Sequence, residues 1–563
     1  MKKAFFLLLT LLLLVTCGTL VSCGNTQDTT EAPGSNEETT PAETEAPKPT
    51  FVFDGEYAPL LPKAPVPEKI YTISKPGDDD ALTLLSAQGL FAKNSNEHIF
   101  IQYDTSTTAY LNAIKKHYPQ ITVSKASGMW LFLKSHTEKF SGYILTDMGD
   151  DSVNVATSLA GILNALIVTP KNESTAKTLG LEMLLDVSDK DDAWLRSSEY
   201  FDKLNKDIAF MLNPTKIEFL RDYAIYNNAY MFTDTDVSQA NLIRRINFLN
   251  DGFVVMGWNN NLGEHGTVEA LSSQNGNMIP SDYAKNIVTL SSFPLVSAQQ
   301  ITDVEATDGK GKHTVCLVMS DGDNMQWVLN DFLSSTKWYA SPHRGDFPLA
   351  WGLPAALMDL APPSVINFYN TMTPNDAFML QLSGTGYTFP SRWKNMDKLA
   401  EMQKDVGSVM ARADLSVLEI LDDVSLNNET VEKYYGGFLK EEAIDGVFYI
   451  DYGNYAGYNG KIFWVEGKPL ITARYRLWAD VGEAATIEGI AKALNKSSTN
   501  PANPLAYSFV IIHAWSGLDG NGNFVNGGNT MNAVAKLVEL LDDDVELVTP
   551  DEFVSRVTEN VKH

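Results

Sequence analysis

Residues 313–324 read HTVCLVMSDGDN, a largely apolar run that ends in a turn with two aspartates. A short apolar run bounded by turn residues predicts a strand buried on both faces, as in parallel sheets. Seven more runs of this kind follow, each leading into a helical or polar connection of about the length of a βα unit. They lie at 348–353, 377–382, 415–421, 446–450, 469–473, 507–513 and 545–549.

Eight parallel strands, each followed by a helix, are the number with which a (β/α)8 barrel closes. We therefore predict an α/β protein whose residues 311–563 form a (β/α)8-like barrel, with a seven-stranded or open sheet as the alternative. Residues 51–310 alternate short apolar runs, such as 98–103 and 253–258, with helical stretches. This alternation predicts an N-terminal α/β region made of subdomains.

The first 50 residues predict export and a lipid anchor. Two lysines precede an apolar run (residues 4–16) that is too short to span a membrane and is typical of a signal peptide. Leu20-Val21-Ser22-Cys23 resembles the lipobox of bacterial lipoproteins, in which the cysteine receives the lipid. We expect removal of residues 1–22 and a disordered stalk over residues 23–50, rich in Thr, Glu and Pro. The body would lie outside the cytoplasm, held to the membrane only by the lipid on Cys23.

The composition limits the partners of this chain. It has 70 acidic and 43 basic residues, a net charge of −27, and therefore lacks the positive surface that nucleic acids require. Of three cysteines, Cys17 leaves with the signal, Cys23 is lipidated and Cys316 lies in an apolar run, so no disulfide is expected in the mature body. We expect a monomer without a cofactor. The many aromatic side chains suit a carbohydrate substrate.

Polar side chains gather after the predicted strands. In a parallel barrel the catalytic groups lie at the carboxyl ends of the strands, so these side chains are the candidate site. The catalytic candidates are Asp321, Asp323, Glu419, Asp451 and His513. Arg474 and Trp515, after the sixth and seventh strands, are candidates for positioning the substrate.

Gly384-Thr385-Gly386-Tyr387-Thr388-Phe389-Pro390 follows the third predicted strand. It resembles the signature of the GxGYxYP putative glycoside hydrolase family, with Phe389 in place of the second tyrosine. The acidic turn and the order of an α/β region before a barrel are also similar to that family. The resemblance covers most of the chain beyond the stalk and implies glycan hydrolysis.

The residues of this motif also allow a direct interpretation. Gly384 and Gly386 permit a positive φ or a close approach of the backbone to a ligand. Tyr387 and Phe389 could line the substrate site as an apolar wall. The alternative is a tight turn whose aromatic side chains pack on a neighbouring loop.

Glycoside hydrolysis normally uses two carboxyl groups, one as acid and the other as base or nucleophile. We expect Asp451 to be the partner of the turn that holds Asp321 and Asp323. A metal-dependent polysaccharide deacetylase is the alternative, since His513 ends a late strand, but the chain has no HxxxH pair. A glycan-binding lipoprotein without activity is a third possibility, which leaves the acidic strand ends unexplained.

Overall fold

The computed structural model describes residues 59–295, 299–300 and 309–563. The predicted signal peptide, the predicted lipidation site Cys23 and the predicted stalk lie outside these ranges. From Thr50 to His563 the chain forms one unit by its internal packing. Within the described ranges, no helix is both long and apolar enough to cross a membrane.

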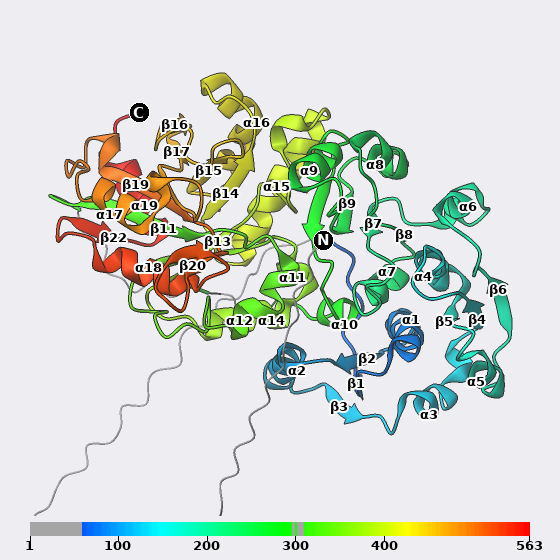
Figure 1. Ribbon diagram of the computed structural model, residues 1–563. Helices are drawn as coiled ribbons and strands as arrows, with labels where there is room; N and C mark the ends of the chain where they lie inside the picture. Colours follow the sequence, from blue (N-terminus) through cyan, green and yellow to red (C-terminus); the bar gives the residue numbers. More distant parts are fainter. Residues whose placement is uncertain (1–58, 296–298, 301–308) are drawn as a thin grey trace, which may run out of the picture. The chain divides into compact units, whose positions relative to one another are not determined.

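The N-terminal region begins with a three-stranded parallel sheet (Figure 1). β1 (Lys69–Ser74) is its central strand, between β2 (Glu97–Gln102) and β3 (Thr122–Lys125). The crossover helix α1 (Asp78–Asn94) begins with three aspartates, whose charge is favourable at a helix N-terminus. Most residues of α1 are buried because it packs against both β2 and α7 (Arg221–Tyr226).

Two further parallel sheets complete the N-terminal region, with orders β5-β4-β6 and β10-β9-β7-β8. The third sheet positions the site, because helix α9 (Glu264–Ser272) follows its strand β9. The strands are β4 (Gly142–Leu145), β5 (Ala165–Val168), β6 (Met183–Asp186), β7 (Ile208–Met211), β8 (Tyr230–Phe232), β9 (Val254–Gly257) and β10 (Asn277–Pro280).

Each of the eight C-terminal runs contains a strand, and all eight belong to one ten-stranded sheet. Its order is β16-β17-β15-β14-β13-β12-β11-β19-β18, with β22 paired beside β11. Every pairing is parallel except the β16–β17 hairpin. The strands are β11 (His313–Met319), β12 (Leu349–Leu353), β13 (Asp376–Leu380), β14 (Val417–Asp422), β15 (Gly446–Asp451), β16 (Ile462–Val465), β17 (Lys468–Thr472), β18 (Tyr475–Leu477), β19 (Tyr507–Ile512) and β22 (Val545–Leu547).

This sheet is curled, and the chain itself links its two ends. β17 pairs with β15 near one end, and β18 pairs with β19 at the other. Only Ala473 and Arg474 separate β17 from β18. The N–H of Ala473 donates to the carbonyl of Tyr449 and the N–H of Arg474 to that of Phe509, both at 2.9 Å. A two-residue linker keeps the two ends of the sheet close together.

A (β/α)8 barrel is not confirmed. The eighth predicted strand, β22, pairs with residues 313–315 of β11 and not with β19. β19 itself pairs with β11 along Thr314–Met319, and therefore takes the place where the eighth strand of such a barrel would stand. The protein is a mixed α/β protein with parallel sheets, and its C-terminal sheet is a curled half-barrel.

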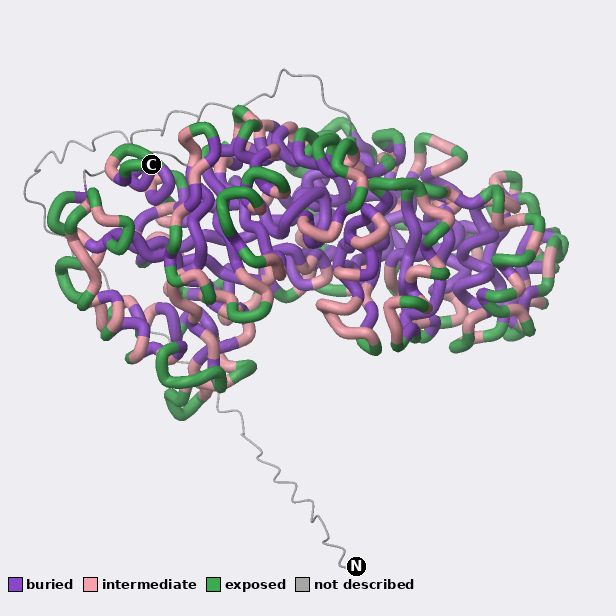
Figure 2. Tube along the Cα trace, turned by 90° about the horizontal axis from the view of Figure 1, so that it is seen from above, coloured by how far each residue is buried: buried purple, intermediate pink, exposed green. Residues whose placement is uncertain are grey.

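Each strand of the curled sheet is buried on both faces, so alternate residues enter different cores. Val315 and Leu317 pack with the covering helices, whereas Cys316 and Val318 belong to the second core. Figure 2 shows buried residues through the interior of the folded unit and exposed residues mainly at its periphery.

The interior of the curl is filled at its amino end. Phe448 of β15 and Phe509 of β19 stack there with ring centroids 4.5 Å apart. Helix α19 (Pro550–Asn560) packs against β11, β14 and β17, and its Asp551 accepts a hydrogen bond from Ser416, just before β14. The carboxyl ends of the strands are left as the place for a site.

Candidate functional site

A pocket of about 300 Å³, here called the acidic pocket, lies at the carboxyl ends of the curled sheet. Strands from both halves of the sheet end at it, and the N-terminal region and the loop after β13 supply further side chains. It is lined by Trp258, Glu264, Ser320, Asp321, Asp323, Asn324, Gln326, Leu382, Tyr387, Glu419, Leu421, Ile450, Tyr455, Trp478, His513 and Trp515.

The acidic turn after β11 is held in a strained conformation. Asp321 has φ +66°, a left-handed conformation that non-glycine residues rarely adopt. Its carboxylate accepts hydrogen bonds from the hydroxyl of Ser320 and, at 3.4 Å, from the amide of Asn324. Ser320 also accepts from the N–H of Ala514 at 3.1 Å, which ties the turn to the end of β19.

Gln381 fixes the other side of this turn. Its amide oxygen accepts from the N–H of Gly322 at 2.8 Å, and its amide nitrogen donates to the carbonyl of Met319 at 3.0 Å. Gly322 is required here because a Cβ would lie 2.4 Å from the backbone carbonyl carbon of Gly352. The turn is therefore locked against β12 and β13, which fixes the position of its two aspartates.

Two carboxyl groups of the acidic pocket are almost fully buried. On β14, Glu419 lies two residues from both Val417 and Leu421. Because side chains two residues apart on a strand point to the same face, Glu419 points into the same core as these apolar side chains. Burial raises the pKa of Glu419 well above its usual value, and the charges of Asp323 and Asp321 add to the effect. Burial likewise raises the pKa of Asp323, helped by Asp321 and Glu264. Both groups therefore favour the protonated form.

A fourth carboxyl group comes from the N-terminal region. Glu264, the first residue of α9, is half-buried and accepts a hydrogen bond of 2.7 Å from the hydroxyl of Tyr387. Burial raises the pKa of Glu264, and Asp321 raises it further, while the bond from Tyr387 opposes both. Among the described residues that line the acidic pocket there is no lysine or arginine to neutralise these four acids.

His513 faces the same pocket from the end of β19. Its ring stacks on Trp478 with centroids 3.8 Å apart and planes 6° apart, and its Nδ1 lies 2.8 Å from the hydroxyl of Ser516. Burial lowers the pKa of His513, and the nearby charge of Asp321 opposes this. Tyr455 packs edge-on against Trp478 at 4.7 Å, so one wall of the pocket is aromatic.

The two motif glycines pack against protein and not against a ligand site: Gly386 packs on β10 of the N-terminal region, and Gly384 packs mainly on Met402 of α15 (Met396–Arg412). Neither has a positive φ. A Cβ on Gly386 would lie 2.7 Å from the carbonyl oxygen of Met278 in β10, and one on Gly384 would lie 2.9 Å from the sulfur of Met402. Tyr387 and Met278 exchange two backbone hydrogen bonds, of 2.7 and 2.9 Å. Gly386 thus lets the motif dock on β10, and this places Tyr387 in the acidic pocket.

The structure brings six of the predicted residues together in the acidic pocket. Asp321, Asp323, Glu419 and His513 line it with Tyr387, and Trp515 lies at its border with a second cavity. Phe389 is fully buried behind it and contacts the rings of His265 and Tyr387.

Two other predicted residues lie outside the acidic pocket. Asp451 ends β15, but its carboxylate faces its own turn, 3.4 Å from the N–H of Gly453, and Tyr455 from the same loop lines the pocket instead. Arg474 donates to the carbonyl of Leu505 at 2.7 Å, near the amino end of β19. It lies there because the chain passes from Arg474 directly into another strand, β18. Trp478, which follows β18, is the residue that reaches the carboxyl edge of the sheet.

The sequence reasoning did not include Glu264, Trp258, Tyr455 or Trp478. A signal existed for Glu264, which follows the predicted strand at 253–258 and precedes a helix. No group of three or more His, Cys, Asp or Glu residues within the described ranges is arranged to hold a metal ion. The donor set that the deacetylase alternative needs therefore has no counterpart in that part of the chain.

The fold and the site define an α/β protein with an acidic and aromatic pocket at the carboxyl ends of a curled parallel sheet. Three family models match it: the "GxGYxYP putative glycoside hydrolase C-terminal domain" at residues 311–558, the "GxGYxYP_N second domain" at 140–204 and the "GxGYxYP third domain" at 206–292. The chain belongs to the GxGYxYP family, so the resemblance seen in residues 384–390 is confirmed.

A solved structure supports the same assignment. The chain is similar to "a putative hydrolase from Bacteroides thetaiotaomicron VPI-5482", with 27% sequence identity and a TM-score of 0.78. The match covers 88% of this chain and 96% of that one. No curated protein matches the chain.

Proposed function

We propose that this protein hydrolyses glycosidic bonds, with Glu264 as the general acid and Asp321 as the base or nucleophile. The observation that carries the proposal is the placement of these two half-buried carboxyl groups in one pocket, each supplied by a different region of the chain. They are close enough for the charge of Asp321 to raise the pKa of Glu264. Two carboxyl groups with different proton affinities are what this reaction requires.

The surroundings distinguish the two roles. The carboxylate of Asp321 accepts hydrogen bonds from Ser320 and Asn324, which hold it in place at the pocket. Burial raises the pKa of Glu264, which favours the protonated form that a general acid needs. Asp323 and Glu419 are too deeply buried to reach a sugar, with 4% and 1% of their surface exposed. They would act as protonated neighbours of Asp321.

The proton balance of this reaction closes with these two groups. Glu264 gives its proton to the glycosidic oxygen as the bond to the anomeric carbon breaks. In an inverting reaction Asp321 takes a proton from the water that attacks that carbon. In a retaining reaction Asp321 forms a bond to the carbon first, and water then cleaves that bond while Glu264 recovers a proton.

The same protein would act outside the cytoplasm. The sequence at residues 20–23 supports a lipid on Cys23, and a lipid at one end of a stalk would leave the acidic pocket free to meet an external glycan. The net charge of −27 makes an uncharged glycan a better substrate than a polyanion.

Hydrolysis is tested with D321N and E264Q in the full-length protein, on a panel of neutral polysaccharides, by release of reducing ends. We expect kcat/KM to fall by about 10²–10⁴-fold in each variant, the usual contribution of an acid or base. D451N is the matched control, because Asp451 also ends a strand of the sheet but lies outside the pocket. NMR of the first sugar anomer released then separates the retaining from the inverting reaction.

Two results would contradict the proposal. If D451N loses as much activity as D321N, the pocket assignment is wrong. If the wild-type protein binds a glycan but releases no product, and D321N binds it equally well, the protein is a binding protein and not a hydrolase.

A further inference from the structure

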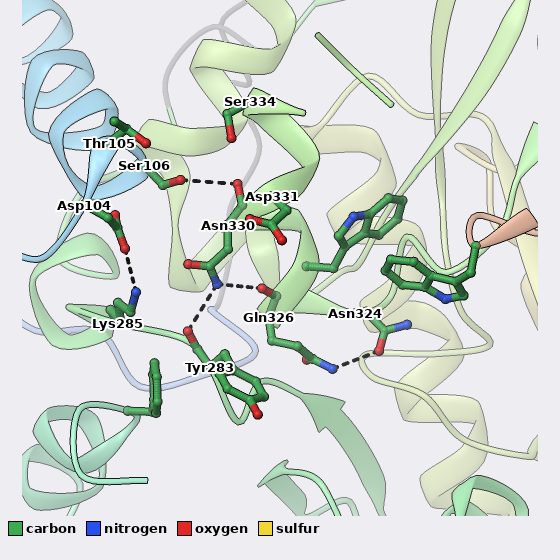
Figure 3. A pocket seen from close by; sticks show the side chains of 13 residues that line it. Asp104, Thr105, Ser106, Tyr283, Lys285, Asn324, Gln326, Asn330, Asp331 and Ser334 are labelled. Atoms are coloured by element: carbon green, nitrogen blue, oxygen red, sulfur yellow. Dashed lines mark hydrogen bonds and ion pairs between the residues drawn. The ribbon is translucent and has the colours of Figure 1, made fainter. Parts of the chain in front are cut away.

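A second cavity of about 470 Å³ adjoins the acidic pocket (Figure 3). The two share three lining residues, Asn324, Gln326 and Trp515, and therefore form a continuous surface. The other residues that line it are Asp104, Thr105, Ser106, Phe219, Tyr283, Lys285, Trp327, Asn330, Asp331 and Ser334.

The walls of this cavity come from both regions of the chain, and hydrogen bonds connect them. Ser106, in helix α2 (Thr105–His117), donates to the carbonyl of Asn330 at 3.3 Å. The amide of Asn330 donates to the carbonyl of Tyr283 at 3.2 Å and to that of Gln326 at 2.6 Å. Figure 3 shows these bonds along one side of the cavity. The cavity is therefore preformed, as small-molecule sites usually are.

An aromatic surface is exposed in this cavity. Tyr283 has 47% of its surface exposed, an unusual value for a large aromatic side chain. It does not rotate freely, because Phe219 packs against its ring at 5.1 Å and the ammonium group of Lys216 lies 4.0 Å from the ring centroid. A fixed and exposed tyrosine offers the apolar contact that the ring faces of sugars make with proteins.

Two residues that line this cavity hold buried polar atoms without a hydrogen-bond partner among the described residues. The amide nitrogen of Gln326 donates to Asn324 at 3.0 Å, while its amide oxygen is buried without a partner among the described residues. The indole N–H of Trp327, a residue 6% exposed, likewise has no partner among them. These residues give the cavity wall a polar part beside its aromatic one, which suits the hydroxyl groups of a sugar.

The charges favour an uncharged ligand. Lys285 is the only basic residue among the described residues that line the cavity, and its ammonium group is paired with Asp104 at 2.6 Å. Asp331 adds a further negative charge. No free positive charge therefore remains for a uronic acid or a sulfated sugar.

We propose that this cavity binds the sugar units next to the scissile bond of a neutral oligosaccharide, whose reacting sugar lies in the acidic pocket. The inference rests on the proposed function for the identity of the adjoining site. It adds that the substrate is a chain of several neutral sugars, and that Tyr283 selects for its length.

The test measures binding and turnover separately as the chain length of the sugar increases. The probes are neutral gluco-, xylo- and manno-oligosaccharides of two to six units. Binding is measured by calorimetry on D321N, which should not hydrolyse them, and turnover is measured on the wild-type protein. We expect affinity in one series to rise at least tenfold between two and four units. Y283A should remove this gain, and Y283F, which keeps the ring, should restore it.

The matched control is Y434A. Tyr434 is also a partly exposed tyrosine with a lysine ammonium group, that of Lys433, 4.7 Å from its ring, but it lies on α16 (Asn428–Lys440), away from both cavities. Combined with D321N, this variant should bind every chain length as D321N alone does.

The inference is overturned if affinity does not depend on length, if Y283A and Y434A behave alike, or if no neutral series binds. These outcomes differ from failure of the proposed function. Length-dependent binding that requires Tyr283, with no product from the wild-type protein, would remove the hydrolase assignment and keep the cavity. Hydrolysis without any dependence on length would keep the hydrolase assignment and remove the cavity as a sugar-binding site.

Discussion

The hydroxyl of Tyr387 donates a 2.7 Å hydrogen bond to Oε1 of Glu264, a residue 123 positions earlier in the chain. Tyr387 belongs to the motif at residues 384–390, which docks on β10 by backbone hydrogen bonds to Met278. Glu264 begins a helix of the N-terminal region. The motif that characterises the family thus joins the two regions and holds the proposed acid at their junction.

Removal of this hydroxyl should change the pH dependence of the reaction. The bond from Tyr387 lowers the pKa of Glu264, so Y387F should raise that pKa. Because the proposed acid acts in its protonated form, the alkaline limb of the kcat/KM profile should move to higher pH. We also expect kcat to fall by about tenfold or more, since a hydrogen bond to a charged group contributes about 1.5–3 kcal/mol.

A second tyrosine–carboxylate pair provides the control for this experiment. Tyr435 donates to Asp422 at 3.0 Å, and both residues are buried outside the acidic pocket. Y435F should therefore lower the melting temperature without moving either limb of the profile. An unchanged alkaline limb in Y387F would exclude Glu264 as the acid.

The strands could be predicted from the sequence because each is a local apolar run. All eight C-terminal runs contain a strand, since a strand buried on both faces needs little beyond its own residues to be recognised. Closure could not be predicted, because it depends on which distant strands pair. Arg474 illustrates the difficulty: a charged residue after an apolar run suggests a strand end, but it lies at a bend between β17 and β18.

The candidate site was predictable only where it depends on single strands. Asp321, Asp323, Glu419 and His513 lie in one pocket because the carboxyl ends of parallel strands meet at one edge. Glu264 follows a predicted strand of another region, but the sequence does not indicate that this strand end meets the acidic pocket, because that depends on how the two regions pack. Asp451 has the pattern of a site residue, yet its carboxylate faces the N–H of Gly453 in its own turn.

The anchor predicted from residues 20–23 can be tested by labelling. In a bacterial host given radioactive palmitate, the wild-type protein should carry the label and sediment with membranes. C23A should lose the label and remain in the membrane-free fraction, because no other lipid site is predicted. C17A is the control and should keep the label. Persistence of the label in C23A would show that the lipid is attached elsewhere.

The docking of the motif can be tested at its two glycines. G386A would place a Cβ 2.7 Å from a backbone carbonyl of β10, which cannot move without disturbing the sheet. We expect a loss of about 1–3 kcal/mol in the free energy of unfolding, measured by denaturant titration. G384A meets first the flexible side chain of Met402, at 2.9 Å, and should lose less. Equal losses would show that the contact with β10 does not decide the effect.

The buried carboxyl groups of the acidic pocket should reduce the stability of the protein as pH rises. Burial raises the pKa of Asp323 in the folded state above its unfolded value, so the folded protein holds a proton that the unfolded chain releases. The free energy of unfolding should therefore fall as pH rises above about 4, the ordinary pKa of aspartate. D323N removes this proton and should raise the melting temperature at pH 7 by about 1 °C, the effect of about 1 kcal/mol in a folded unit that runs from Thr50 to His563. The gain should shrink towards pH 4.

D519N is the control, because hydrogen bonds from Asn523 lower the pKa of the exposed Asp519 and no gain is expected there. A D323N variant that is less stable than the wild-type protein at pH 7 would mean that Asp323 is charged in the folded protein and is stabilised by its partners.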